Sequence, residues 1–310
     1  MISSFVITGF LGVGKTTLLI NTVKEHFKDK KIAIVVNEFG EVGVDATILK
    51  NVYSEVIEIS EGCICCKLSQ EFEKGILEII DKQKPDLIFV ETSGTSEPFP
   101  IYMSLKNLGI FVNGIVCVID TKNFDNYKHH STAKYQIGGS NILVLNKTDL
   151  VDENTLKKVE AEVRDIKEQF NVKNILTGKP LFKNYVIVKT KYGKLPKEIF
   201  TDIPDVKDLS LENISQLFQS NHISEDNFSQ KIVYVPDGID FEELKNMLSN
   251  LPDNIYRVKG IVKVRDFPKP IVINYAFGDI SFDEVNQYNG KSFLILIGTN
   301  LEKENIIKLN

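Results

Sequence analysis

A glycine-rich run near the start of the chain constrains the fold more than any other feature. Residues 9–17 have the spacing G-x-x-x-x-G-K-[ST], after an apolar segment at 5–7 and before a helical pattern at 16–27. Phosphate-binding loops require this context. Glycines let backbone N–H groups converge on phosphates, and the helix N-terminus adds its dipole. We therefore expect Lys15 to reach the β- and γ-phosphates of a nucleotide, and the Thr16 hydroxyl to bind Mg²⁺.

Short apolar runs alternate with amphipathic ones over the first half of the chain. Residues 86–90, 114–119 and 141–145 are almost continuously apolar, as strands covered on both faces of a parallel sheet are. The alternation predicts an α/β fold with a doubly wound, mostly parallel sheet of the P-loop NTPase type. The other predicted strands are 5–7, 31–36, 56–59 and 185–189, and the predicted helices are 16–27, 72–80 and 155–170.

The chain changes character after residue 194. Residues 195–230 are polar, with prolines at 196 and 204, and we expect a linker with at most one short helix there. Strand patterns then follow in succession, which predicts a smaller α+β domain. The expected division is a P-loop domain at 1–194, a linker at 195–230 and a C-terminal domain at 231–310. Within the last we expect strands at 232–235, 258–264, 270–276 and 292–297, and helices at 241–251 and 301–309.

A polar motif follows the predicted strand 141–145. It reads Asn146-Lys147-Thr148-Asp149, and a carboxylate here can accept hydrogen bonds from N1–H and the 2-amino group of guanine. Adenine lacks this donor pair and would leave the carboxylate unpaired. In a chain with a phosphate loop, the motif predicts a guanine nucleotide.

Two further loops follow predicted strands. Glu91 ends the strand 86–90 and can hold Mg²⁺ directly or through water, or contact the attacking water. Gly94 can offer its N–H to a γ-phosphate. Residues 37–45 are rich in carboxylates and glycines, which suits a segment that senses the γ-phosphate. An acidic capping loop at Glu91 and a solvated loop at 37–45 are the alternatives.

Three of the four cysteines lie together, as Cys63, Cys65 and Cys66. Thiolates select ions such as Zn²⁺, Co²⁺ or Cu⁺. A closed zinc site needs four ligands, usually with a second ligand pair, and the chain has no second cysteine pair. We expect an open site that Glu38 or a small ligand completes, with buried core thiols or a redox pair as alternatives. Cys117 lies in an apolar run and is expected in the core.

Charge and hydropathy exclude some functions. The chain has 37 Lys and Arg against 42 Asp and Glu, so nothing suggests the basic face that nucleic acid requires. The longest charge-free run, residues 1–14, is too short to span a bilayer and lacks the basic start of a signal peptide. A cytoplasmic location is expected. His129 and His130 lie in a polar stretch and are expected to be solvated, with a metal-bound pair as the alternative.

Taken together, these motifs resemble the CobW-type metallochaperone GTPases, and they occur in the same order. Residues 256–260 (YRVKG) resemble that family's second-domain signature, and residues 293–298 resemble its last strand. Related hydrogenase and urease nickel GTPases lack the second domain. Many family members carry histidine-rich stretches, whereas this chain has none.

The resemblance implies a GTPase of the SIMIBI class that uses GTP and Mg²⁺ to load or release a metal ion, with zinc or cobalt as the expected cargo. Lys15 and Glu91 are the predicted catalytic residues. The predicted transition-metal ligands are Cys63, Cys65, Cys66 and Glu38, and the predicted magnesium ligands are Thr16 and Asp45. The predicted nucleotide contacts are Gly9, Gly12, Gly14, Lys15, Thr16, Thr17, Gly94, Asn146, Lys147 and Asp149.

The expected partner is a client metalloprotein or a cofactor-biosynthesis enzyme, with no nucleic acid and no membrane. A nucleotide-dependent homodimer is compatible with this scheme. Two other functions fit the same motifs. One is a regulatory GTPase whose cysteines are purely structural, and the other is an activator that inserts a cofactor or remodels a metalloenzyme.

Overall fold

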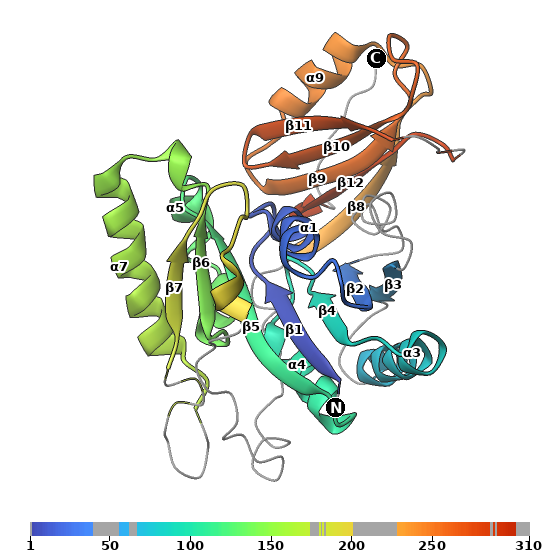
Figure 1. Cartoon of the computed structure of the whole chain (residues 1–310). Helices are drawn as coiled ribbons and strands as arrows, with labels where there is room; N and C mark the ends of the chain where they lie inside the picture. The colour runs from blue at the N-terminus through green and yellow to red at the C-terminus, as the bar shows by residue number, and fades with distance from the viewer. Residues whose placement is uncertain are drawn as a thin grey trace.

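The computed structural model describes residues 2–39, 56–61, 67–173, 180, 182, 184–200, 228–285, 288 and 290–301. Two sheets form the frame, one of seven strands and one of five (Figure 1). The first has the order β3-β2-β4-β1-β5-β6-β7, and the second has the order β11-β10-β9-β12-β8.

All neighbouring strands of the first sheet run parallel. Every residue of the strands β4 and β6 is buried, because helices cover both faces of the sheet. Parallel strands direct their carboxyl ends to one edge, so the loops after β1, β4 and β6 meet there. The strands are β1 Ser3–Thr8, β2 Ile32–Phe39, β3 Val56–Glu61, β4 Leu87–Glu91, β5 Phe111–Asp120, β6 Ile142–Asn146 and β7 Val186–Lys189.

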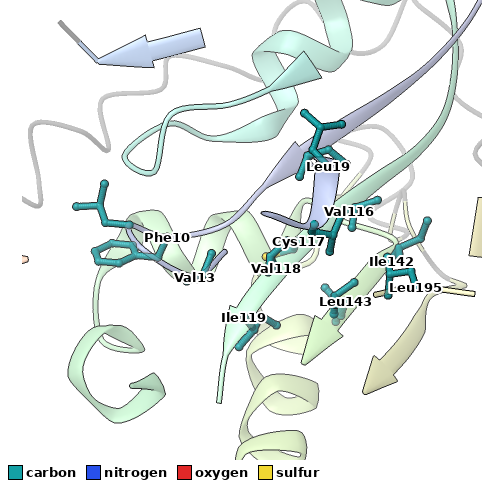
Figure 2. Packing of buried hydrophobic residues seen from close by; sticks show 14 of the residues in the cluster. Phe10, Val13, Leu19, Val116, Cys117, Val118, Ile119, Ile142, Leu143 and Leu195 are labelled. Carbon is teal, nitrogen blue, oxygen red and sulfur yellow. The ribbon is translucent and has the colours of Figure 1, made fainter. Parts of the chain in front are cut away.

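The helices divide between the two faces of this sheet. Alternate residues of β1 mark the faces, since Phe5 packs in the same buried cluster as α1 and α7, and Val6 packs with α3 and α4. Figure 2 shows Leu19 of α1 near Val116 and Cys117 of β5. The helices are α1 Lys15–His26, α3 Lys67–Gln83, α4 Pro98–Asn107, α5 Phe124–Tyr127, α6 Ser131–Gly138 and α7 Glu153–Phe170, with 3₁₀ turns η1 Thr148–Leu150 and η2 Lys197–Phe200.

The second sheet is antiparallel throughout. Helix α9, Phe241–Ser249, buries Leu244 and Leu248 against one of its faces. Ile261 and Ile295, on β9 and β12, belong instead to the cluster that contains α1. The two sheets therefore share a core, and the second sheet lies against the first (Figure 1). Its strands are β8 Phe228–Tyr234, β9 Ile255–Val262, β10 Ile271–Ala276, β11 Asp279–Glu284 and β12 Phe293–Thr299.

The predicted fold class is confirmed: a doubly wound parallel sheet is followed by a smaller α+β unit. The sequence did not indicate α4, α5, α6 or β11. Helix α4 begins Pro-Phe-Pro, which interrupts an apolar pattern although proline is favourable in a first helical turn. Strand β11 is mostly polar and exposed or half-buried. Residues 302–309 of the predicted closing helix lie outside the described residues, and the domain boundaries stay predictions.

No helix among the described residues has both the length and the apolar character needed to cross a lipid bilayer.

Candidate functional site

The loop between β1 and α1 has the backbone that its glycines predict. Gly9, Gly12 and Gly14 all have positive φ, at 140°, 71° and 101°. A Cβ at Gly9 would collide with the Val118 carbonyl, and a Cβ at Gly12 would collide with Ala276 of the second sheet. Only glycine combines this backbone with such close neighbours.

Lys15 lies inside this loop. Its side chain is buried, and Nζ donates hydrogen bonds of 3.0 Å to the Gly9 carbonyl and 3.1 Å to the Phe10 carbonyl. Burial and the nearby Arg257 guanidinium lower the pKa of Lys15 to about 7, although Glu91 opposes this. Burial destabilises the charged ammonium, so an anionic ligand that binds beside it would stabilise the charge.

Thr16 and Glu91 meet because β1 and β4 are parallel neighbours, with Ile7 opposite Glu91. Thr16 Oγ1 donates a 2.8 Å hydrogen bond to Glu91 Oε1. Glu91 Oε2 is buried and has no hydrogen-bond partner among the described residues. Burial raises the pKa of Glu91, against the opposing effect of Lys15. An orphaned carboxylate oxygen beside a hydroxyl fits Mg²⁺, which prefers oxygen ligands.

The loop after β6 is fastened to the phosphate loop. Asn146 Nδ2 donates to the Val13 carbonyl at 3.0 Å, and Asn146 Oδ1 accepts from Gly193 N at 3.1 Å. Lys147 Nζ donates to Asp120 Oδ2 at 2.7 Å and to the Gly12 carbonyl at 3.3 Å. Asn146 and Lys147 therefore hold the loop in place. Asp149 lies in η1 with an exposed side chain.

Gly94, in the loop after β4, packs on Leu11 so closely that a Cβ would collide with that side chain. Thr92 Oγ1 donates a 2.9 Å hydrogen bond to Thr8 Oγ1 at the end of β1. The predicted nucleotide residues after β1, β4 and β6 are thus brought together at one edge of the first sheet.

A cavity of about 350 Å³ lies between this edge and the second sheet, which is within the size range of ligand sites. Two rows of paired residues on β9, β10 and β11 contribute to its wall: Arg257–Ala276–Asp279 and Lys259–Asn274–Ser281. The first sheet contributes Gly12, Gly14, Lys15, Thr16, Thr17, Ile20, Glu91 and Lys147.

Arg257 and Lys259 were not predicted as site residues, although residues 256–260 were noted as a second-domain signature. The signal was present, since two cations one residue apart interrupt an otherwise apolar strand and point to the same face. Their function could not be predicted from the sequence because no contiguous motif links them to the phosphate loop.

The histidine prediction is partly wrong. His129 is exposed, as expected, but His130 is half-buried. Its ring lies 5.2 Å from the rings of Phe10 and Tyr256. Phe10 also stacks on Tyr127 at 5.0 Å. His130 is therefore part of an aromatic contact between the phosphate loop and the second sheet, and the polar sequence around it hid this role.

The predicted transition-metal residues are not brought together by the described part of the chain. Cys63, Cys65, Cys66 and Asp45 lie outside the described residues, and Glu38 lies near the end of β2. No group of three His, Cys, Asp or Glu residues suited to a metal occurs among the residues described. Cys117 is buried in the core as predicted, and burial raises the pKa of its thiol to about 12.

Comparison with known proteins agrees with this architecture. Residues 3–174 match the model of the CobW/HypB/UreG nucleotide-binding domain, and residues 229–309 match that of the cobalamin synthesis protein cobW C-terminal domain. The chain is 33% identical over 196 residues to the zinc chaperone CobW of a Sinorhizobium species, covering 52% of this chain and 55% of that protein.

Two other relatives cover more of the chain. The zinc-regulated GTPase metalloprotein activator 1 of Schizosaccharomyces pombe is 33% identical over 240 residues, covering 72% of this chain and 53% of that protein. The zinc chaperone YjiA of Escherichia coli is 24% identical over 318 residues, covering 97% of this chain and 95% of that protein. The chain spans about half the length of the Sinorhizobium and yeast relatives. The chain belongs to the CobW/HypB/UreG family and carries the CobW C-terminal domain.

Proposed function

We propose that this chain is a GTPase that carries a divalent transition metal and delivers it to a client protein. The observation that carries the proposal is the meeting of Lys15 with the Thr16–Glu91 pair in one cavity, beside the loop that holds Asp149. Family membership supports the same activity.

Lys15 would bind the phosphates. Its Nζ donates hydrogen bonds to two carbonyls of its own loop, and phosphate oxygens would accept these hydrogen bonds instead. The ammonium would then stabilise the charge that develops on the transferring phosphoryl group. The backbone N–H groups from Gly9 to Thr17 would bind the remaining phosphate oxygens.

Thr16 and Glu91 would hold Mg²⁺, and Asp45 is a proposed further ligand outside the described residues. Glu91 would contact the ion directly or through water. The bound ion neutralises charge on the phosphates. Glu91 and Thr16 also keep each other in place through their hydrogen bond.

Asp149 would read the guanine base. Asn146 and Lys147 would support it indirectly, because their side chains tie the base-reading loop to Val13, Gly12 and Asp120. A base held by Asp149 and phosphates held by Lys15 would then have a fixed spacing, which favours one nucleotide geometry.

Cys63, Cys65 and Cys66, with Glu38, are the proposed ligands of the transported metal. Zinc is the favoured cargo, since two of the relatives are named zinc chaperones and the third a zinc-regulated activator, and cobalt is the alternative that thiolates also accept. The yeast relative's name favours a metalloprotein as the client.

The test is a Co²⁺ titration with GTP analogue, with GDP and without nucleotide, because thiolate ligation of Co²⁺ gives an intense near-ultraviolet band. We expect nucleotide and metal to strengthen each other's binding by roughly 1–3 kcal/mol. Cys65→Ala and Cys66→Ala should lose the band, and Cys117→Ala should keep it because Cys117 is a core residue.

A band of equal strength in all three nucleotide states would contradict the coupling. A band that survives both Cys65→Ala and Cys66→Ala would show that the cysteines are not the ligands. The chain would then be better described as a regulatory GTPase with structural cysteines.

A further inference from the structure

The wall opposite Lys15 carries two positive charges from the second sheet. Arg257 and Lys259 alternate along β9, so they project from the same face, and both line the cavity. Lys259 is buried, with 8% of its surface exposed, and Arg257 is half-buried.

Both cations line the same cavity as Lys15 and Glu91. Arg257 is the charged group that most lowers the pKa of Lys15, and Lys259 adds to the effect. Lys15, Arg257 and Lys259 repel one another, and water screens this repulsion poorly at a buried site. A polyanion bound between them would attract all three and so offset the repulsion.

Two acidic residues of β11, Asp279 and Asp283, also line the cavity. Asp279 accepts a 2.6 Å hydrogen bond from Lys122 and a 3.3 Å hydrogen bond from Asn123, so its charge is largely compensated. Arg257 and Lys259 share the cavity with Lys15, which marks the end where a phosphate loop holds the terminal phosphates of its nucleotide.

Contacts around the phosphate loop fix β9 in this position. Phe277, in the turn between β10 and β11, stacks on Phe10 with ring centres 6.3 Å apart, and Ala276 lies directly against Gly12. Because Ala276 pairs with Arg257 across the sheet, the docked turn places the cations before any nucleotide arrives. Such prior placement reduces the entropy lost on binding.

We infer that Arg257 and Lys259 bind the terminal phosphate of the nucleotide, so that the second sheet completes the phosphate site of the first. The inference rests on the proposed GTPase function. It gives the C-terminal domain a specific task, because a triphosphate would bridge the two sheets whereas a diphosphate would contact mainly the phosphate loop.

The experiment measures the affinity of the full chain for a non-hydrolysable GTP analogue and for GDP, both with Mg²⁺, by calorimetry. Arg257→Ala and Lys259→Met should each weaken the analogue about tenfold or more and GDP less than about threefold, as loss of a charged hydrogen bond predicts. Arg257→Lys should keep most of the preference for the analogue. Lys263→Ala is the matched control, since Lys263 follows β9 but pairs with Asp237 and does not line the cavity.

Thermal unfolding is measured first, and if Lys259→Met does not fold, the half-buried Arg257 decides the result. An unchanged ratio of the two affinities in Arg257→Ala would overturn the inference, and so would an equal loss for both nucleotides. If the unaltered protein binds neither nucleotide, the proposed function itself fails. Normal binding by the unaltered protein with no effect of Arg257→Ala overturns only the inference.

Discussion

The parallel sheet reaches the cavity with the loops that follow its strands, whereas the antiparallel sheet reaches it with the face of the strands themselves. Lys15 begins the helix after the β1 loop, Glu91 is the last residue of β4, and Lys147 follows β6. Arg257 and Lys259 lie within β9, paired with β10 in the middle of the sheet. Backbone N–H groups are therefore available from the first sheet, while those of β9 are used in strand pairing and only its side chains can bind a ligand.

This difference predicts that the first sheet supplies the essential chemistry and the second adjusts it. Substitutions in the loops should therefore have larger effects than those at the contact between the sheets.

Lys15→Ala should have the largest effect. Removing the ammonium deletes charge stabilisation of the transferring phosphoryl group, so GTP hydrolysis should fall about 10²-fold or more. Phosphate release under single-turnover conditions measures this. Lys24→Ala, an exposed lysine in the same helix, should hydrolyse GTP normally. If Lys15→Ala hydrolyses GTP at the rate of the unaltered protein, Lys15 does not take part in the reaction.

Asp149→Asn should change the preferred base. The amide can no longer accept two hydrogen bonds from guanine, so the affinity for GTP should fall on the order of 10²-fold while xanthosine triphosphate gains. Competition binding with GTP, ATP and xanthosine triphosphate measures the change. Glu153→Gln alters an exposed carboxylate nearby and should leave the preference intact. Equal binding of ATP and GTP by the unaltered protein would contradict the assignment.

Gly12→Ala should loosen the contact between the sheets. The new Cβ would collide with Ala276 and would also meet a φ of 71°, so the free energy of unfolding should fall by roughly 1–3 kcal/mol. Gly109→Ala is a matched control, with a φ of 73° and nothing within 4 Å of its Cβ. In an Ala276→Gly background the collision is absent, so Gly12→Ala should there cost about as much as Gly109→Ala. Denaturant unfolding that shows the same loss at Gly12 and Gly109 would argue against close docking.

Nucleotide binding at pH 8 should take up a fraction of one proton. The pKa of Lys15 is lowered to about 7 by burial and Arg257, so the side chain is mostly neutral at pH 8 before binding. Phosphates favour the ammonium, so binding raises this pKa and affinity should increase as pH falls from 9 toward 7. Calorimetry in buffers of different ionisation enthalpy detects the uptake, and Glu91→Gln excludes a contribution from Glu91. The side chain of Lys15→Arg is charged at all of these pH values. The same proton uptake in this variant would therefore mean that another group takes up the proton.

Asp279→Asn should have the smallest effect. The Lys122–Asp279 ion pair spans the two sheets at 2.6 Å, but both side chains are about two-fifths exposed, at 42% and 41%. Water and salt screen such a pair, so a double-mutant cycle with Lys122→Ala should give less than about 1 kcal/mol. A coupling of several times that value, removed by salt, would mean that charge rather than apolar packing holds the sheets together.

The sequence predicted those parts of the site that lie in one contiguous stretch. Residues 9–17 and 146–149 could be recognised because each loop carries its own glycines or carboxylate next to an apolar strand. Arg257 and Lys259 could not, because they are brought to Lys15 by contacts between the two sheets, such as the packing of Phe277 and Ala276 on the phosphate loop. That packing depends on the position of one sheet against another, which local patterns do not encode.

The same limit applies to the elements that the sequence missed. Strands β4 and β6 are buried throughout and apolar except at their last residues, Glu91 and Asn146, so they could be predicted. Strand β11 has a largely polar sequence and becomes a strand through its pairing with β10. Helix α5 spans Phe124–Tyr127, which is too short to show a helical period.

A crystal structure of the full chain with Mg²⁺ and a non-hydrolysable GTP analogue tests the central claim most directly. We predict that the terminal phosphate lies between Lys15 and Arg257, with Glu91 and Thr16 facing the metal ion and guanine at Asp149. A nucleotide bound to the phosphate loop while β9 makes no contact with any phosphate would contradict the two-sheet site.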